Sequence, residues 1–511
     1  MAITFNDWVN LNFIYYYNGS SYSSNYASST AFDYFSDGAS VGSALYFGMR
    51  FDENPPKSEK FRNLKFYVGT TASYTDAIFE WQYWDGSSWV PIAVTDNTND
   101  FQNSGENTVV FTPPNDWREK TINGQKAHWL RKIFLSGTIT EGGAQSTQVV
   151  KAGSNTIQAT GTVDMDDIYN ADVSGSWGVV EKIGDNSYYV SGADILFGDG
   201  GTTSTTVDLS DNHIYVENNW RFWMYKRINL TLNHTAIRMR VDHGDCWGWT
   251  YSGVFDARKM QWYIDGGSAT DSMIDFYVGY ACSFQIRSNI TWDKCLFIDR
   301  GTGGGTSGYI IDDHYGTPTY NDCIFHLGGN LDIASSLSNN RCKFKVKTLR
   351  GFVADPTFNK PEFLEITYLK SYYSNITINN PVFVDDTYTV VAHPNDRWIK
   401  IYYDLNIHVQ NNNGGDVAGA SVVIKDKDGN EVFSGTTDSN GNVSTTLLVK
   451  YTPGDTDTEV DYNPFDFIVT KDGYYDLNAL DVNIKKEFTS DAPFILVSKS
   501  EEAGGSSAYV V

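Results

Sequence analysis

One short pattern, Cys-x-Phe, recurs four times in the middle of the chain: Cys282-Ser-Phe284, Cys295-Leu-Phe297, Cys323-Ile-Phe325 and Cys342-Lys-Phe344. The same spacing occurs with proline in place of cysteine in Pro356-Thr-Phe358 and Pro381-Val-Phe383. In a β-strand, residues i and i+2 point to the same face, so each segment sends a small side chain and a ring in one direction. The pattern therefore predicts repeated strands, with these cysteines and Phe297, Phe325 and Phe344 as structural residues of successive rungs.

Short strands separated by asparagine turns surround these units. Asparagines punctuate such strands in Ser-Asn-Ile-Thr at 288–291 and in Ser-Asn-Ile-Thr-Ile-Asn-Asn at 374–380. A strand of four or five residues, a turn and another such strand is how a parallel β-helix is built, with each coil covering its neighbour. Residues 146–403 thus resemble the right-handed parallel β-helix family of pectin-lyase type, which includes many phage tailspikes. The intervals between the six units are irregular, and a stack of β-sandwiches is the alternative fold.

The five cysteines of the chain predict neither a disulfide framework nor a metal site. Four of them occupy matching positions in the repeated units, where they would stack as small buried apolar residues. A zinc site is disfavoured because the chain contains no Cys-x2-Cys pair. We therefore expect no metal and no cofactor.

The N-terminal region, residues 1–145, has the pattern of an antiparallel β-sandwich. Ile78-Phe-Glu-Trp-Gln-Tyr83 alternates rings with polar residues, and a turn at Asp85-Gly86 leads to Trp89-Val-Pro-Ile92, which together predict a hairpin. The tryptophan-rich stretch from residue 79 to residue 132 resembles sandwich modules of phage baseplate and tail proteins. That resemblance carries no catalytic motif.

The C-terminal region, residues 404–511, alternates short strands with Asp-Gly and Asn-Gly turns. Gly419-Ala-Ser-Val-Val-Ile424, Gly435-Thr-Thr-Asp438 with Gly441, and Lys471-Asp-Gly-Tyr474 fit the motifs of the carboxypeptidase-regulatory type of immunoglobulin-like domain. The region resembles that family, which implies an immunoglobulin-like β-sandwich that acts as a spacer or binding arm. The expected fold class of the whole chain is all-β.

Composition narrows the classes of partner. The 511 residues include 38 Lys and Arg against 62 Asp and Glu, a net charge of −24, which argues against nucleic acid because phosphate binding needs clustered cations. An aromatic content of 15% excludes intrinsic disorder. No apolar run reaches transmembrane length, so no membrane insertion is expected. The start, MAITFNDWVN, lacks the features of a secretory signal, and we expect synthesis in a host cytoplasm without export by that route.

Two acidic pairs are the candidates for catalysis. Glycosidases use two carboxyl groups, about 5 to 9.5 Å apart depending on mechanism. Asp164 and Asp166 would share one face of a strand, and Asp312 and Asp313 lie beside His314. With 62 acidic residues such pairs arise often by chance, so a structural role is favoured for both pairs.

One further stretch is chemically unusual. Asp242-His-Gly-Asp-Cys-Trp247-Gly-Trp249 combines two carboxylates, an imidazole, a thiol and two indoles. Trp247 and Trp249 are candidates for stacking on sugar rings, although tryptophans of β-proteins more often belong to a core or an interface.

Together these features predict a virion surface protein: a spike, fibre or capsid-decoration subunit that takes part in particle assembly and host attachment. The expected partners are further copies of the chain in a homotrimer, other virion proteins and a host surface glycan. A polysaccharide-degrading tailspike enzyme and a bacterial adhesin are the alternatives.

Overall fold

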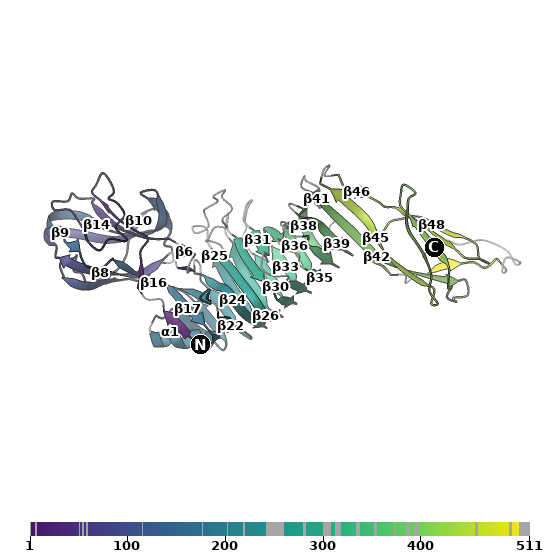
Figure 1. Ribbon diagram of the computed structural model, residues 1–511, viewed down its shortest axis with the longest axis horizontal. Coiled ribbons are helices and arrows are strands. Elements are labelled where there is room, and N and C mark those ends of the chain that lie inside the picture. Colours follow the sequence, from purple (N-terminus) through teal and green to yellow (C-terminus); the bar gives the residue numbers. More distant parts are fainter. Residues whose placement is uncertain are drawn as a thin grey trace. The chain divides into compact units, whose positions relative to one another are not determined.

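The fold is given by a computed structural model, shown in Figure 1. It is all-β, as expected, with 61% of residues in strands and 3% in helices. No helix among the described residues is long and apolar enough to cross a membrane. The structure describes residues 2–499 except for 6–7, 51, 54–55, 58–59, 115, 176, 202, 218–219, 242–259, 279–282, 300–307, 312–317, 334–337, 352–354, 372–373, 385–387, 393–396, 455–457 and 490–492.

The chain divides into two compact units, residues 1–290 with 298–308 and residues 291–297 with 309–511. The first unit begins with two antiparallel sheets, which we call the two-sheet region (residues 8–154). One sheet contains β3 (Phe13–Tyr17), β5 (Ala44–Met49), β9 (Ser73–Trp84), β10 (Trp89–Pro91), β13 (Glu119–Ile122) and β14 (Gln125–Glu141). The other contains β2 (Trp8–Asn10), β4 (Phe32–Asp33), β8 (Phe61–Thr70), β11 (Thr95–Asp96), β12 (Gly105–Val110), β15 (Ala144–Gln145) and β16 (Lys151–Ser154).

The hairpin expected in this region is confirmed. Strands β9 and β10 pair antiparallel, with Trp89 opposite Trp84. The turn between them is held by Asp85, whose Oδ1 accepts the backbone N–H groups of Ser87 and Ser88, each at 2.7 Å. This pair of hydrogen bonds is the local reason why an Asp-Gly-Ser-Ser segment reverses the chain.

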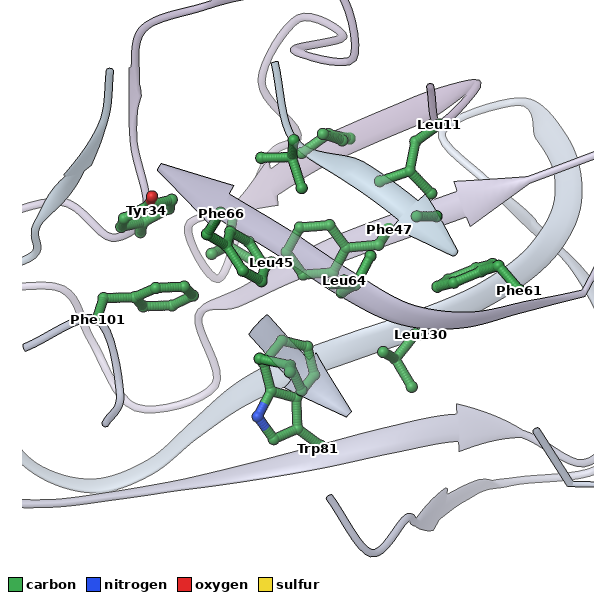
Figure 2. Packing of buried hydrophobic residues seen from close by; sticks show 14 of the residues in the cluster. Leu11, Tyr34, Leu45, Phe47, Phe61, Leu64, Phe66, Trp81, Phe101 and Leu130 are labelled. Carbon is green, nitrogen blue, oxygen red and sulfur yellow. The ribbon is translucent and has the colours of Figure 1, made fainter. Parts of the chain in front are cut away.

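Aromatic side chains from both sheets form the core of the two-sheet region (Figure 2). Phe47 of β5 and Phe66 of β8 meet across the core with ring centroids 5.6 Å apart and planes at 81°. Tyr34 stacks on Phe101 at 4.0 Å. Trp117 is fully buried, and its indole N–H donates to the carbonyl of Trp129 at 3.2 Å.

The same unit also contains parallel strands, which begin with β17 (Thr156–Thr160). Strand β1 (Ala2–Phe5), at the start of the chain, pairs antiparallel with β17. Three series can be traced, and each strand pairs in parallel with the next member of its series. The long strands β24 and β26 take part in two series at once. The series are β17 (Thr156–Thr160), β21 (Asp194–Phe197), β24 (Phe222–Asn233), β26 (Met260–Thr270), β28 (Ser283–Ser288); β18 (Thr162–Val163), β22 (Thr205–Asp208), β24, β26; and β20 (Ser187–Val190), β23 (His213–Val216), β25 (Ala236–Val241), β27 (Met273–Val278).

The second unit continues with parallel strands of the same kind (Figure 1). One series contains β29 (Thr291–Asp293), β32 (Thr319–Asn321), β35 (Ser338–Asn340), β37 (Thr357–Asn359), β39 (Ile376–Asn379) and β42 (Trp398–Asn411). The others include β33 (Ile324–Leu327), β36 (Lys343–Gly351), β38 (Glu362–Ser371) and β40 (Val382–Phe383), and β34 (Asn330–Ile333), β36, β38 and β41 (Thr389–Ala392).

Five phenylalanines of this unit lie one above another, and we call them the phenylalanine ladder. Successive ring centroids are 4.9, 5.3, 5.5 and 4.9 Å apart. The first two pairs of rings are almost parallel, at 6° and 4°. The members are Phe297, which lies in β30 (Leu296–Asp299), Phe325, Phe344, Phe363 and Phe383.

The ladder corrects the repeat expected from the sequence. Pro356-Thr-Phe358 does not belong to it, because Phe358 pairs with Asn339 and Ile378 in a different series. Its place is taken by Pro361-Glu-Phe363, since Phe363 pairs with Phe344. From Cys323, the small residue then recurs after 19, 19 and 20 positions, at Cys342, Pro361 and Pro381, so the coil length is nearly constant there.

The three cysteines described in this unit, Cys295, Cys323 and Cys342, are buried thiols and form no disulfide with one another. The thiol of Cys323 lies 3.4 Å from the carbonyl of Trp292, and that of Cys342 lies 3.4 Å from the carbonyl of Tyr320. Hydrogen bonding with Cys295 and Cys342, together with burial, raises the pKa of the Cys323 thiol. Cys282 lies outside the described residues, and Phe284 pairs with Met260 in the first unit.

A second ladder runs beside the first and consists of asparagine amides. The amide nitrogen of Asn340 donates to Asn321 at 2.8 Å, that of Asn359 to Asn340 at 3.1 Å, and that of Asn379 to Asn359 at 2.9 Å. The residue after each asparagine has a positive φ, between 50° and 53°, at Asp322, Arg341, Lys360 and Asn380. This left-handed residue turns the chain between two strands of one coil.

The C-terminal region contains a four-stranded antiparallel sheet in the order β44, β43, β47, β48. The strands are β43 (Ser421–Lys425), β44 (Glu431–Thr436), β47 (Phe465–Thr470) and β48 (Leu477–Val482). Strand β42 also pairs antiparallel with β45 (Asn442–Pro453) and parallel with β49 (Phe488–Thr489) and β50 (Phe494–Leu496). Turns expected from sequence form at Asp428-Gly429 and Asn440-Gly441, where both glycines have positive φ.

Candidate functional site

Of the candidate site residues, only one acidic pair can be placed. Asp312, Asp313, Trp247 and Trp249 lie outside the described residues. Asp164 and Asp166 lie at the start of α1 (Met165–Gly175) and not in a strand, so the expectation that they share one face of a strand is wrong.

The reason for the helix is a reciprocal cap at its first turn. Asp164 Oδ1 accepts the N–H of Asp167 at 2.8 Å, and Asp167 Oδ2 accepts the N–H of Asp164 at 3.2 Å. An acidic residue at each of these positions satisfies N–H groups that a helix leaves unpaired, and it also faces the positive end of the helix dipole. Because the segment is helical, the alternation of side chains along a strand does not describe how Asp164 and Asp166 are placed.

Asp166 is engaged by two neighbours. Its carboxylate forms an ion pair with Lys182 at 2.6 Å, and it interacts with the hydroxyl of Tyr188. Hydrogen bonds from Lys182 and Tyr188 lower the pKa of Asp166 below its ordinary value. Burial, followed by the hydrogen bond to Asp166, raises the pKa of Tyr188 to about 12. Asp166 is thus held ionised at neutral pH and is suited to accept hydrogen bonds.

Asp164 and Asp166 line a polar pocket of about 220 Å³ in the first unit. Two further carboxylates reach it from β22 and the turn after it, where Asp208 Oδ1 accepts the N–H of Ser210 at 3.0 Å and its hydroxyl at 2.7 Å. The lining residues are Asp164, Met165, Asp166, Asn186, Tyr188, Asp208, Ser210, Asp211 and Asn212.

The sequence interpretation missed Asp208 and Asp211. The only sequence signal is the polar run Asp208-Leu-Ser-Asp-Asn212 directly after a short β-type segment, which predicts a turn and not a site. More than 40 residues separate Asp208 from Asp166, so only the parallel pairing of β18 with β22 brings the two segments together.

The chemistry of this pocket is that of a polar, negatively charged surface. Carboxylates, amides and hydroxyls can accept or donate hydrogen bonds to a hydroxyl-rich ligand such as a sugar. Among the described residues, no three His, Cys, Asp or Glu side chains are placed to hold a metal ion.

The fold and pocket define an all-β protein with stacked parallel strands and a pocket lined by four aspartates. Comparison of the chain with known protein families, with curated proteins and with solved structures finds no match.

Proposed function

We propose that the chain is a structural subunit on the surface of a virus particle, of spike, fibre or capsid-decoration type. In this proposal its parallel strands form a right-handed β-helix that serves as a stiff shaft. The observation that carries the proposal is the pair of ladders, in which five phenylalanines and four asparagines repeat in register through the second unit.

The ladders support stiffness for a physical reason. Each strand inside the stack has its backbone hydrogen-bonded to a strand above and to one below, as β36 is to β33 and β38. Bending the stack would separate rings about 5 Å apart and stretch amide hydrogen bonds of 2.8 to 3.1 Å. Long stacks of this kind suit a role that transmits force or spans a distance better than one that needs a closing active site.

The proposed partners are two further copies of the chain, other virion proteins and a host surface glycan. Two exposed apolar side chains flank the last ring of the phenylalanine ladder: Val382 and Val384 are 50% and 61% exposed. Contact between copies of the chain would cover Val382 and Val384, so these two side chains are candidates for the homotrimer interface.

Purified particles from the source of the sequence test the proposal directly. Mass spectrometry should detect the chain as a stoichiometric component, and electron microscopy with a gold label on a C-terminal tag should place it on the particle surface. Sedimentation of the purified chain should give the mass of three copies. Particles that lack the chain would overturn the proposal.

A polysaccharide-degrading enzyme is the second candidate, because Asp164 and Asp166 share one pocket with Asp208 and Asp211. The test is to incubate the protein with host capsular or wall polysaccharide and to measure new reducing ends. Release of oligosaccharides by the wild type and by Asp185→Asn, an exposed control, but not by Asp166→Asn would favour the enzyme. Equal absence of release from all three would favour the structural subunit.

A further inference from the structure

A lysine lies in the core of the two-sheet region. Lys132, on β14, is only 1% exposed. Its ammonium group lies over three rings, 5.4 Å from the centroid of Phe79, 4.8 Å from Trp81 and 5.2 Å from Phe101. Trp81 and Phe101 belong to the core shown in Figure 2. An ammonium group rarely occupies such a place unless its charge is compensated.

Two aspartates face this ammonium group. Asp96 Oδ2 lies 2.8 Å from Lys132 Nζ, and Asp100 Oδ1 also contacts Nζ. The side chain of Asp96 is 15% exposed and that of Asp100 is 43% exposed. Lys132 belongs to the sheet of β9 and β14, whereas Asp96 ends β11 in the other sheet. The contact therefore joins the two sheets through the core.

The backbone around the second aspartate is held in an unusual conformation. Asn99, Asp100 and Phe101 have φ of 48°, 53° and 67°, so three consecutive non-glycine residues are left-handed. Phe101 is fully buried, and the hydroxyl of Tyr74 donates to the carbonyl of Asp100 at 2.8 Å. Strained backbone persists where the surrounding structure enforces it, and here it holds the Asp100 carboxylate against Lys132.

The first aspartate is held by donors other than the lysine. Asp96 Oδ1 accepts the backbone N–H of Thr98 at 2.9 Å and also the Thr98 hydroxyl. Its Oδ2 accepts the indole N–H of Trp81 at 3.1 Å. The carboxyl carbon of Asp96 is thus fixed beside a nitrogen, and its Oδ1 faces two donors that can stabilise negative charge developing on it.

We propose that Lys132 and Asp96 become joined by an intramolecular amide bond, with Asp100 as the proton carrier. Asp100 takes a proton from the Lys132 ammonium group and passes it to a carboxyl oxygen of Asp96, and the neutral amine then attacks the carboxyl carbon of Asp96. The N–C bond forms and one C–O bond of Asp96 breaks. Asp100 passes a second proton from the nitrogen to the same oxygen, which leaves as water. One ammonium and one carboxylate become one neutral amide, and Asp100 ends ionised as it began.

The environment favours this product in two ways. The reaction removes an ion pair from a core lined by aromatic rings, where charges are poorly solvated. The same rings exclude water, which slows hydrolysis of the amide once it has formed. The product would be a covalent tie between the two sheets, independent of the function of the chain.

The mass of the full chain tests the proposal. Protein purified after folding should have a mass lower by one water molecule than its sequence requires. A tryptic digest should contain residues 66–118 joined to residues 132–151, with fragmentation placing the link at Asp96. A sequence-true mass, with residues 66–118 and residues 133–151 found as separate peptides because trypsin cleaves after an unmodified Lys132, would overturn the proposal and leave a buried ion pair. A link at Asp100 would overturn the assigned roles.

Three variants sharpen the result. Lys132→Arg should restore the sequence-true mass, and Asp100→Asn should leave a large fraction of the chains unlinked. Lys126→Arg is the matched control, because Lys126 lies on the same strand and forms its own ion pair, with Glu119 at 2.8 Å. It should remain fully linked. Complete linkage in Asp100→Asn would remove Asp100 from the mechanism, and the mass of the wild type decides the bond itself even if a variant fails to fold.

Discussion

The two-sheet region and the parallel strands of the second unit both have aromatic cores, but their rings meet differently. In the two-sheet region Phe47 and Phe66 meet at 81° and Phe61 and Trp117 at 62°. In the phenylalanine ladder, neighbouring rings lie as little as 4° from parallel, as Phe325 and Phe344 do. The same residue type therefore builds an interlocking cluster in one region and a regular stack in the other.

The difference follows from the strand arrangement. Parallel strands in register place equivalent side chains directly above one another at the strand spacing of about 4.8 Å, close to the ring separations of 4.9 to 5.5 Å in the ladder. Two facing sheets impose no such repeat, so their rings meet at varied angles, from the stacked pair of Tyr34 and Phe101 to the edge-to-face pair of Phe47 and Phe66. A ring inside the ladder has one ladder ring before it and one after it, and Phe325 also meets Tyr320 at 5.5 Å. Phe66, between the two sheets, meets rings from three separate segments, those of Tyr34, Phe47 and Phe101. Damage should therefore stay local in the ladder and spread in the two-sheet region.

The largest effect is expected from Trp117→Ala in the two-sheet region. The change removes a fully buried indole and its hydrogen bond to Trp129, and should cost about 5 kcal/mol of unfolding free energy. Hydrogen exchange should speed up across both sheets. Exchange that changes only next to residue 117 would contradict the shared core. Trp117→Phe is the milder control.

A smaller and more local loss is expected from Phe325→Ala. Cavity formation between Phe297 and Phe344 should cost about 3 to 4 kcal/mol. Faster hydrogen exchange should be confined to the adjoining strands β30 and β36. Ile324→Ala, at the neighbouring and only partly buried position, is the control and should cost less. Loss of protection throughout the unit would show that the ladder is as cooperative as the two-sheet core.

A gain in stability is expected from Asn339→Leu. Asn339 is 2% exposed, and its amide has no hydrogen-bond partner among the residues that the structure describes. Its strand neighbours, Tyr320 and Phe358, are fully buried. Removing an unsatisfied buried amide should raise the unfolding free energy by about 1 to 2 kcal/mol, measured by urea denaturation. A lower midpoint would show that the amide has a partner.

The next residue should respond in the opposite direction. Asn340→Ala removes two hydrogen bonds of the asparagine ladder, those with Asn321 and Asn359, and should lower the unfolding free energy by about 1 kcal/mol. Asn379→Ala removes one ladder bond, to Asn359, and should cost about half as much. Equal losses from the two variants would argue against additive ladder bonds.

The smallest effect is expected from the ion pair of Asp322 with Arg341, whose side chains meet at 2.8 and 2.6 Å. Hydrogen bonding to Arg341 lowers the pKa of Asp322 in the folded protein. The stabilisation is present above the unfolded pKa of about 3.9 and is lost as the pH falls through the folded value. Asp322→Asn should be slightly less stable at pH 7, and the difference should shrink below about pH 4. A difference that grows on acidification would reverse the assigned sign.

The sequence predicted where strands lie better than it predicted which strands occupy the same position in successive coils. The alternation in Ile78–Tyr83 and the Asp85-Gly86 turn sufficed for the hairpin because both signals are local. The Cys-x-Phe pattern and its proline form found four of the five members of the phenylalanine ladder, Phe297, Phe325, Phe344 and Phe383. Pro356-Thr-Phe358 fitted the spacing equally well but belongs to another series. Only pairing with Phe344 distinguishes Phe363 from Phe358.

The candidate site was less predictable than the fold. Asp164 and Asp166 were identified as a pair, yet their spacing was interpreted as that of a strand, because the capping pattern with Asp167 was not recognised. Asp208 and Asp211 carry no local signal that sets them apart from the other acidic residues. Lys132 likewise looks like an ordinary strand lysine until the two sheets are brought together.

By itself, the sequence determined that the chain is all-β, where many strands and turns lie, and which small residues and rings share a face, because alternation and turn chemistry act over a few residues. The tertiary structure alone decided which coils are in register, which carboxylates share a pocket and which aspartates face Lys132. Those outcomes depend on hydrogen bonds and packing between segments far apart in the chain, on which the spacing of residues within one segment has no influence.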